Sequence, residues 1–454
     1  MSGLDAGIFF AENDRTPLQI ASVAVFEGKP PSYGDLARLI LSKLPQVPRY
    51  RQRVRTVPLN FARPVWADDR HFQVHYHVRR VAVAAPGGAS QLQDVASRIL
   101  EQRLDLGRPL WEVWLIEGLA AGRWALICKV HHCLVDGVGG SGLMTLMFDL
   151  SPDQTPAELR PWTPEAEPST LSLVLSGIRD TVGEPLRQAA NIAALARRQA
   201  GAEITSFVGG WPRYAARLTQ VGASSLNGPT SPHRRWLWAQ ADLDEVRRVR
   251  CAFGGTVNDV ILAAVTGGFR DLLGARGLLS DDTLVRTVVP ISVRAPGEQG
   301  LLTNRLSVVL VNLPCGEPDP VRRLDLVREQ MEFLKDTHQA IGPDAFIRFV
   351  GMAPALLAAA ARTVLMLRQP VVQAITTSIP GPTFPLYVMG RKLVAMYPYV
   401  PIVAGVRISI GTISYLGTLH FGLTGDFDAM PDLDVLSNGI RTGLDELVKE
   451  AIRT

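Results

Sequence analysis

The chain has 454 residues, of which 47% are hydrophobic and 20% are charged, and it carries a net charge of +4. This balance excludes an intrinsically disordered chain, and so small a net charge does not favour a nucleic-acid partner. Because a single hydrophobic core stops growing at about 250–300 residues, the length predicts two domains.

The first residues, MSGLDAGIFF, contain no basic segment of the kind that opens a secretory signal peptide, so we expect a cytoplasmic protein. The four cysteines form no C-x-x-C pair, which favours inert thiols in a reducing compartment over disulfides or a zinc site. They are Cys128, Cys133, Cys251 and Cys315.

Helix and strand patterns mix in the first 150 residues. The stretch DLARLILSKL places Leu36, Ile40 and Leu44 on one face of a predicted helix. The stretch HFQVHYHV, residues 71–78, alternates apolar and polar residues as a half-buried strand does.

The three histidines of that predicted strand, His71, His75 and His77, would share one face. A solvated polar face is the favoured interpretation, and a metal site is the alternative.

Gly and Pro residues divide the chain. Residues 151–170 contain five prolines and read as a linker, and a helical stretch follows to about residue 200. We predict an N-terminal domain over 1–150, a Pro-rich and helical linker over 151–230, and a C-terminal domain over 231–454.

The second half opens with a well-marked helix. In TVNDVILAAVTGGFRDLLGARG, Thr256 and Asp259 have capping-box spacing, and Gly274 is placed to end the helix. Near the C-terminus, VRISIGTISYLGTLHFGLTGDFD predicts two strands joined as a β-hairpin at residues 415–417. These patterns predict an α/β fold.

The most apolar segment, residues 349–367, is interrupted by Pro354 and Arg362. It therefore falls short of the roughly 20 apolar residues of a clean membrane-spanning helix. We predict a buried helix, with a helix that lines a lipid pocket or rests on a membrane surface as the alternative.

The stretch KVHHCLVDGVGGSG, residues 129–142, is open to three chemical interpretations. Its glycines formally match a dinucleotide-binding motif, but six residues separate Gly137 from the preceding strand, and a Pro-rich linker stands where the acidic residue belongs. A metal site would recruit His131, His132 and Asp136, yet adjacent residues that leave a strand point to opposite faces.

The third interpretation is proton transfer. It needs a neutral histidine at a strand end, and the ordinary histidine pKa of about 6.5 suits a base at neutral pH. Asp136 would anchor the loop through an arginine, and Gly137 would leave room for substrate beside the imidazole. The seven-residue arrangement after a strand favours this interpretation.

The segment HHCLVDG fits HHxxxDG, the motif of acyltransferases with the chloramphenicol acetyltransferase-like fold. The flanking segments resemble the bacterial wax ester synthase/diacylglycerol acyltransferase family, nearly from end to end. They are LDAGIFFAE, RYRQRV, LDLGRPLWEVWLIEGL, SSLNGP, TVNDVILAAV, VPISVR, SIPGP and SYLGTLHFGLTGD. The resemblance implies a two-domain CoA-dependent acyltransferase fold, with mixed sheets, flanking helices and an active-site tunnel between the domains.

The chain departs from the family pattern in two places. Ser378 stands where the family usually has Asn, and Thr303-Asn304 stands where it usually has Gly-Asn. The first change removes a side-chain amide and the second implies a different turn, but neither affects the base.

By resemblance, His132 is the general base that takes the hydroxyl proton as the acceptor oxygen attacks the thioester. His131 is expected to support the backbone, and Asp136 to form a structural ion pair with Arg294, beside Gly137. No G-x-S-x-G elbow occurs, which favours direct transfer without an acyl-enzyme.

Two further groups of residues are implied. Asn258 and Asp259 either start a helix or face the site, with Asn258 holding the oxyanion or substrate and Asp259 contacting substrate. Pro109, Leu110 and Trp111 either pack locally or shape the acyl or acceptor channel.

The implied substrates are fatty acyl-CoA and either diacylglycerol or a long-chain alcohol, without a metal and without a cofactor other than the acyl-CoA substrate. We expect peripheral association with the inner face of the membrane or with lipid droplets. The alternatives are an acyltransferase for a polyketide or other secondary alcohol, and a catalytically degenerate lipid-binding protein. The sequence leaves the acceptor, the acyl-chain length and the oligomeric state open.

Overall fold

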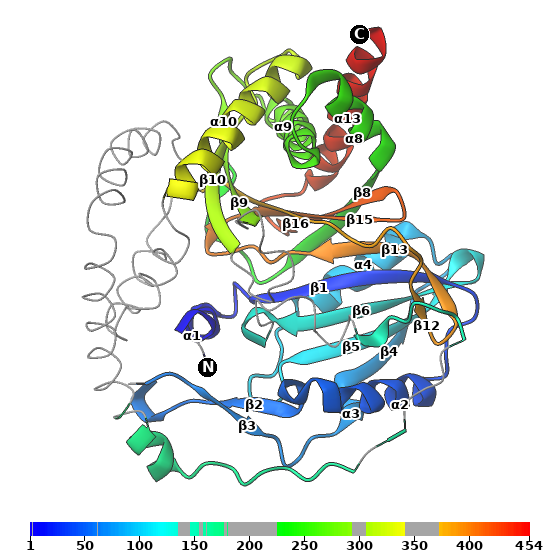
Figure 1. Cartoon of the computed structure of the whole chain (residues 1–454), viewed down its shortest axis with the longest axis vertical. Coiled ribbons are helices and arrows are strands. Elements are labelled where there is room, and N and C mark those ends of the chain that lie inside the picture. The colour runs from blue at the N-terminus through cyan, green and yellow to red at the C-terminus, as the bar shows by residue number, and fades with distance from the viewer. Residues whose placement is uncertain are drawn as a thin grey trace.

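The computed structural model describes residues 1, 3–60, 62–134, 146–153, 158–159, 161–176, 179, 225–292, 306–340 and 372–454. Two six-stranded sheets organise these residues, and helices pack on both sheets (Figure 1). Both sheets combine parallel and antiparallel neighbours, which confirms the predicted α/β fold with mixed sheets.

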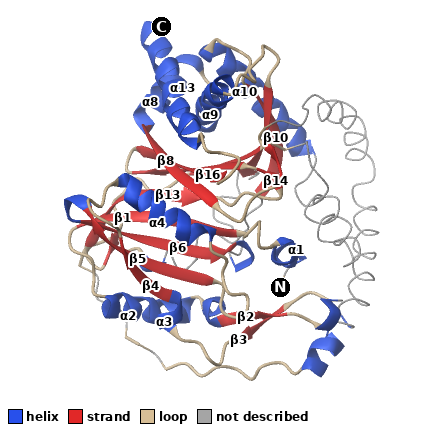
Figure 2. Ribbon diagram, turned by 180° about the vertical axis from the view of Figure 1, so that it is seen from behind, coloured by secondary structure: helices blue, strands red, loops and turns tan. Residues whose placement is uncertain are grey.

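The first sheet has the strand order β12-β13-β1-β6-β5-β4. Its strands are β12 (Tyr387–Val388), β13 (Arg391–Tyr399), β1 (Gln19–Glu27), β6 (Arg123–His131), β5 (Trp111–Leu119) and β4 (Val78–Ala82). Helix α2 (Tyr33–Lys43) packs on one face through Leu36 and Ile40, as the sequence predicts, and α4 (Ala89–Glu101) packs on the other face (Figure 2).

The second sheet has the strand order β10-β9-β11-β15-β16-β8. Its strands are β10 (Leu306–Pro314), β9 (Leu284–Ser292), β11 (Ala374–Ile379), β15 (Ile408–Tyr415), β16 (Thr418–Asp426) and β8 (Arg234–Asp242). Its helices are α8 (Leu243–Phe253), α9 (Val257–Ala275), α10 (Pro320–Ala340) and α13 (Leu433–Arg453).

Shorter elements complete the described fold. They are α1 (Gly3–Ala11), α3 (Val74–His77), the antiparallel pair β2 (Gln52–Arg55) and β3 (Val65–Asp68), and the pair β7 (Asn227–Gly228) and β14 (Gly405–Val406).

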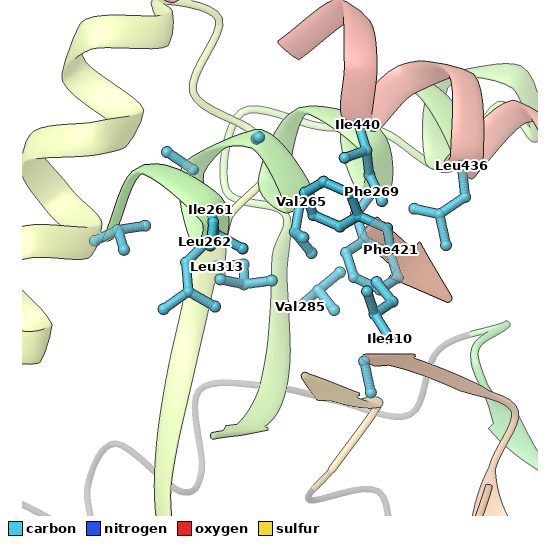
Figure 3. Packing of buried hydrophobic residues seen from close by; sticks show 14 of the residues in the cluster. Ile261, Leu262, Val265, Phe269, Val285, Leu313, Ile410, Phe421, Leu436 and Ile440 are labelled. Carbon is cyan, nitrogen blue, oxygen red and sulfur yellow. The ribbon is translucent and has the colours of Figure 1, made fainter. Parts of the chain in front are cut away.

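The core of the second half is an apolar layer between α9, α13 and the sheet. Figure 3 shows Phe269 of α9 beside Phe421 of β16, with Ile440 of α13 next to them. Glycines let the two helices approach closely, because a Cβ on Gly268 would lie 2.9 Å from the Leu436 carbonyl oxygen. The backbones of α9 and α13 therefore lie in direct contact.

Strand β13 joins the two halves of the molecule. Although it comes from the C-terminal half of the sequence, it pairs with β1 in the first sheet, from Ala21↔Tyr399 to Phe26↔Leu393 (Figure 1). It also packs against β15 and β16 of the second sheet. The predicted boundaries at residues 150 and 230 therefore do not separate the two sheets, because β12 and β13 follow residue 230 in the sequence but belong to the first sheet.

Two local predictions of the second half are confirmed. The Thr256 hydroxyl accepts from the Asp259 N–H, and the Asp259 carboxylate accepts from the Thr256 N–H at 2.8 Å, which forms the capping box of α9. Strands β15 and β16 form the predicted hairpin, whose turn residues Leu416 and Gly417 have φ of 46° and 81°. Positive φ at both positions fits a two-residue turn.

Two other local predictions are wrong. Residues 74–77 form a helical turn that buries Val74 and His77 one turn apart, so the strand begins only at Val78. Tertiary packing overrides the alternating pattern there, because the His77 ring stacks on Trp111. Helix α9 continues past Gly274 to Ala275, and the left-handed residue that follows is Gly277, with φ of 66°.

Among the helices of the described ranges, none is by itself both long and apolar enough to span a membrane. Helices α8 and α9 pass that test when they are joined, but a 103° bend separates them. The apolar segment 349–367 and most of the predicted linker lie outside the described residues.

Candidate active site

The histidine pair lies where β6 ends beside the start of β1. His131 is the last residue of β6, and His132 begins a 3-10 turn, His132–Leu134. The His131 N–H donates to the Leu110 carbonyl at 3.0 Å, and the His132 N–H donates to the Leu18 carbonyl at 2.9 Å. Both histidines are thus held at the backbone by neighbouring segments.

The two imidazoles occupy opposite environments. His131 is fully buried, whereas the His132 side chain is exposed. This outcome agrees with the expectation that adjacent residues at a strand end face opposite sides. Such an arrangement does not suit one metal ion held by both rings.

His132 is exposed at its surface, yet protein surrounds it closely enough to displace much of its water. This desolvation lowers the pKa of the imidazole below its ordinary value of 6.5. The electrostatic influence of the neighbouring His131 adds to the lowering, whereas the hydrogen bond of the ring to its own backbone and the Asp5 carboxylate oppose it. A lowered pKa keeps His132 neutral at physiological pH, as a proton acceptor must be.

His131 makes its contacts inside the protein. Its Nδ1 accepts from the Cys133 N–H at 3.2 Å and lies 2.9 Å from the Cys133 Sγ. Its Nε2 lies 3.4 Å from the Glu12 Oε2, and the Phe9 ring lies beside the imidazole with a centroid distance of 6.1 Å. His131 therefore ties the 3-10 turn to α1, which packs against that turn.

Glu12 directly follows α1 and its side chain is fully buried. Burial opposes ionisation of the carboxyl, but hydrogen bonding and charge from His131 and Arg103 outweigh it and lower the pKa of Glu12. Arg103 approaches within 3.3 Å and also pairs with the exposed Asp14. Sequence reasoning missed Glu12, whose one signal was an acidic residue at the end of the apolar segment LDAGIFFAE.

Pro109, Leu110 and Trp111 are all buried. The Trp111 Nε1 donates to the Tyr50 carbonyl at 2.8 Å, and the His77 ring stacks on the indole at 4.5 Å between centroids. Leu110 supplies the carbonyl that holds His131. This geometry favours the packing interpretation, in which the segment supports the histidine pair from behind.

His77 does not share a face with the other two histidines of its segment, since His71 and His75 are exposed. Desolvation lowers the pKa of His77 to about 4, and its Nδ1 lies 2.8 Å from the Trp111 carbonyl oxygen. The predicted common polar face is therefore wrong. No cluster of three or more metal-ligating side chains occurs in the part of the chain that the structure describes.

Asn258 and Asp259 lie in the first turn of α9, in the other half of the molecule. Asp259 is buried, and one carboxylate oxygen closes the capping box while the other makes no hydrogen bond to a described group. The helix-start interpretation is thereby supported for Asp259. A contact of Asn258 with substrate stays a prediction.

Several predicted site residues lie outside the described residues, namely Asp136, Gly137, Arg294 and the Thr303-Asn304 pair. Ser378 is described and sits in β11 opposite Thr412 of β15. The ion pair between Asp136 and Arg294 stays a prediction.

The chain matches a known protein family over most of its length. The model of the wax ester synthase/diacylglycerol acyltransferase catalytic domain matches residues 1–261, and the model of the C-terminal domain named WS/DGAT matches residues 302–448. A Mycobacterium tuberculosis protein described as a probable diacylglycerol O-acyltransferase is 35% identical over 452 residues, which cover 99% of this chain and 95% of that protein.

Solved structures show the same similarity. The wax ester synthase/diacylglycerol acyltransferase from Marinobacter aquaeolei matches with a TM-score of 0.72 and 25% identity over 99% of this chain and 98% of that chain. The trichothecene 15-O-acetyltransferase from Fusarium sporotrichioides matches with a TM-score of 0.64 and 12% identity, over 98% and 94% of the two chains. The second match shows a shared fold alone.

Proposed function

Because the chain belongs to the wax ester synthase/diacylglycerol acyltransferase family and is an acyltransferase, we propose that it esterifies diacylglycerol with a fatty acyl group from coenzyme A. The product is then triacylglycerol, and long-chain alcohols are a second class of acceptor that would give wax esters. The similar mycobacterial protein is described as a probable diacylglycerol O-acyltransferase, which favours diacylglycerol as the acceptor.

In the proposed reaction, His132 is the general base. The acceptor oxygen attacks the thioester carbonyl carbon while His132 takes the hydroxyl proton. The C–S bond then breaks, and the proton returns from the imidazole to the leaving sulfur as coenzyme A thiol. A free alcohol is far less acidic than imidazolium, so proton transfer must accompany attack.

The observation that carries this proposal is the contrast between the two imidazoles. The exposed His132 with its lowered pKa is accessible to a substrate hydroxyl, whereas the fully buried His131 is not. In the proposed division of work, His131 supports the turn, Asp136 and Arg294 hold the following loop, and Gly137 leaves clearance.

Two further parts of the proposal concern the substrate. Asn258 is proposed as a donor to the developing oxyanion, a contact whose loss costs roughly 10²- to 10³-fold in rate in well-studied cases.

The reaction uses no metal and no cofactor besides acyl-CoA. Since the acyl chain and the acceptor partition into lipid, we place the protein peripherally at the inner membrane face or at lipid droplets.

The test compares the purified protein with His132→Ala, using labelled palmitoyl-CoA with diacylglycerol or hexadecanol as acceptor. Loss of the base is expected to reduce kcat by roughly 10²- to 10⁴-fold, while the exposed position of the side chain leaves Tm unchanged. Equal product from both proteins would remove His132 from the mechanism. Product from hexadecanol but none from diacylglycerol would overturn the choice of acceptor.

A further inference from the structure

Resting on the proposed role of His132, we infer that Glu12 is a positioning residue: its buried carboxylate holds His131 in one tautomer and thereby fixes the turn that presents His132. Glu12 reaches the histidine pair from a different part of the chain, at the end of α1. Its side chain is fully buried, yet its pKa is lowered, which favours the charged form.

The Glu12 side chain and the His131 side chain both have 0% exposure, and they approach to 3.4 Å. Burying a carboxylate costs several kcal/mol unless partners compensate for the lost water, and apolar replacement of buried ion pairs is often neutral or stabilising. Glu12 has such partners, because its carboxylate accepts from the Leu18 N–H and pairs with Arg103, each at 3.3 Å. A carboxylate held in this way also orients the imidazole that faces it.

The contacts of His131 determine its tautomer. A backbone N–H, that of Cys133, donates to Nδ1, so Nδ1 must carry the lone pair and the proton must sit on Nε2. Nε2 is the atom that faces Glu12, at 3.4 Å from the Oε2, although the contact does not reach hydrogen-bond geometry. The carboxylate thus favours the one tautomer that can accept from the turn.

The same hydrogen bond links His131 to His132. Cys133 is the second residue of the 3-10 turn His132–Leu134, so fixing its N–H on Nδ1 fixes the turn. The backbone carbonyls of Leu18 and Leu110 hold the two histidine N–H groups on either side. A misplacement of a reacting group by about 1 Å can cost about 10²-fold in rate. A small shift of this turn is therefore expected to slow the reaction at His132.

Glu12, His131 and Cys133 form a carboxylate, imidazole and thiol row, which resembles the arrangement of a cysteine nucleophile. The thiol does not fit that role, because Cys133 is 2% exposed and burial raises its pKa to about 12. The row therefore serves geometry and not covalent catalysis.

Arg103 supplies a matched control within the chain. Its guanidinium pairs with Glu12 and also with Asp14, whose side chain is 90% exposed and has no contact with His131 among the described groups. Asp14→Asn removes one of the two ion pairs of Arg103 and leaves the Glu12 contact intact. Exposed ion pairs contribute about 0–1 kcal/mol, so this variant should keep wild-type activity and stability.

The experiment measures kcat, both KM values and Tm for Glu12→Met, Glu12→Gln and Asp14→Asn, beside His132→Ala. Methionine keeps the volume but offers no acceptor oxygen, whereas glutamine keeps an oxygen and loses the charge. We expect kcat to fall by about 10- to 100-fold in Glu12→Met and by less in Glu12→Gln, with both KM values within about two-fold of wild type. Tm in Glu12→Met should fall, because removing one partner of a buried ion pair leaves the others uncompensated, and kcat is therefore expressed per folded molecule.

A purely structural role predicts the same fall in Tm but leaves kcat per folded molecule at the wild-type value in both Glu12 variants. That result overturns the inference. His132→Ala separates the two hypotheses: if it retains activity the proposed base is wrong, whereas full loss there with wild-type rates in Glu12→Met rejects the positioning role alone.

Discussion

Two contacts between elements are held together by different interactions. The first region is the C-terminal end of α4 where it meets β1 and β6, and the second is the contact of α9 with α13. At the first, Lys129 and Gln19, both buried, donate to the carbonyls at the C-terminal end of α4. At the second, glycines bring two helices to backbone contact inside an apolar layer. Directional polar contacts fix orientation, whereas close packing contributes stability. The histidine pair follows Lys129 at the end of β6, beside the first region.

The largest effect on this comparison is expected from Lys129→Met. Lys129 is fully buried and lies 3.1 Å from Glu112, so its loss leaves the buried carboxylate with the partly exposed Arg79 and the Trp114 Nε1–H. Breaking a buried pair costs about 3–5 kcal/mol of unfolding free energy. Denaturant unfolding measures the loss.

The control replaces the whole pair with Lys129→Met and Glu112→Leu together. Since a buried ion pair is often matched by apolar residues of similar volume, most of the lost stability should return. If the double variant is as unstable as the single one, the polar contacts at this interface are themselves stabilising, and the contrast between the two regions weakens.

The next effect concerns the helix contact. Gly268→Ala places a Cβ 2.7 Å from the Ile440 Cγ1 and 2.9 Å from the Leu436 carbonyl oxygen, so the helices must separate. Overpacking of this kind costs about 1–3 kcal/mol. Thermal unfolding should show the loss as a lower Tm.

Gly274→Ala is the matched control in the same helix. Its Cβ would meet Leu279 at 3.8 Å, an ordinary contact, so only helix propensity changes. Alanine is favoured over glycine in a helix by about 1 kcal/mol, and the variant should be slightly more stable than wild type. Equal destabilisation by both substitutions would show that backbone freedom, and not close approach, sets the cost.

How far the sequence predicts this molecule depends on the distance over which a feature is encoded. The capping box of Thr256 and the hairpin after Tyr415 are local patterns, and both are confirmed. The pairing of β13 with β1 joins residues 367 to 378 positions apart, and no local pattern encodes it. The contact between Glu12 and His131 is hidden for the same reason, although both residues stand in recognisable segments.

A smaller effect is expected in the pH dependence of the rate. His132 must be neutral to accept a proton, so the rate is full above its pKa and falls as the pH drops through it. Desolvation lowers that pKa, and therefore the acid limb of kcat/KM should lie below 6.5. Asp5 opposes the lowering, so Asp5→Asn should move the limb to still lower pH. A limb at or above 6.5 in the wild type would contradict this assignment.

The smallest effect is expected from Cys133→Ala, which tests whether the thiol that touches His131 has a chemical role. Burial raises the pKa of Cys133 and of Cys315 to about 12, but Cys315 lies in the apolar layer of the second half, whereas Cys133 lies 2.9 Å from a histidine. In Cys133→Ala the backbone N–H still donates to Nδ1, so the tautomer of His131 survives and kcat should change by less than about three-fold, as in Cys315→Ala.

Labelled palmitoyl-CoA without acceptor should leave no acyl group on the wild-type protein. Acylation that disappears in Cys133→Ala and persists in Cys315→Ala would establish a covalent intermediate and turn the row of Glu12, His131 and Cys133 from a positioning device into a nucleophile.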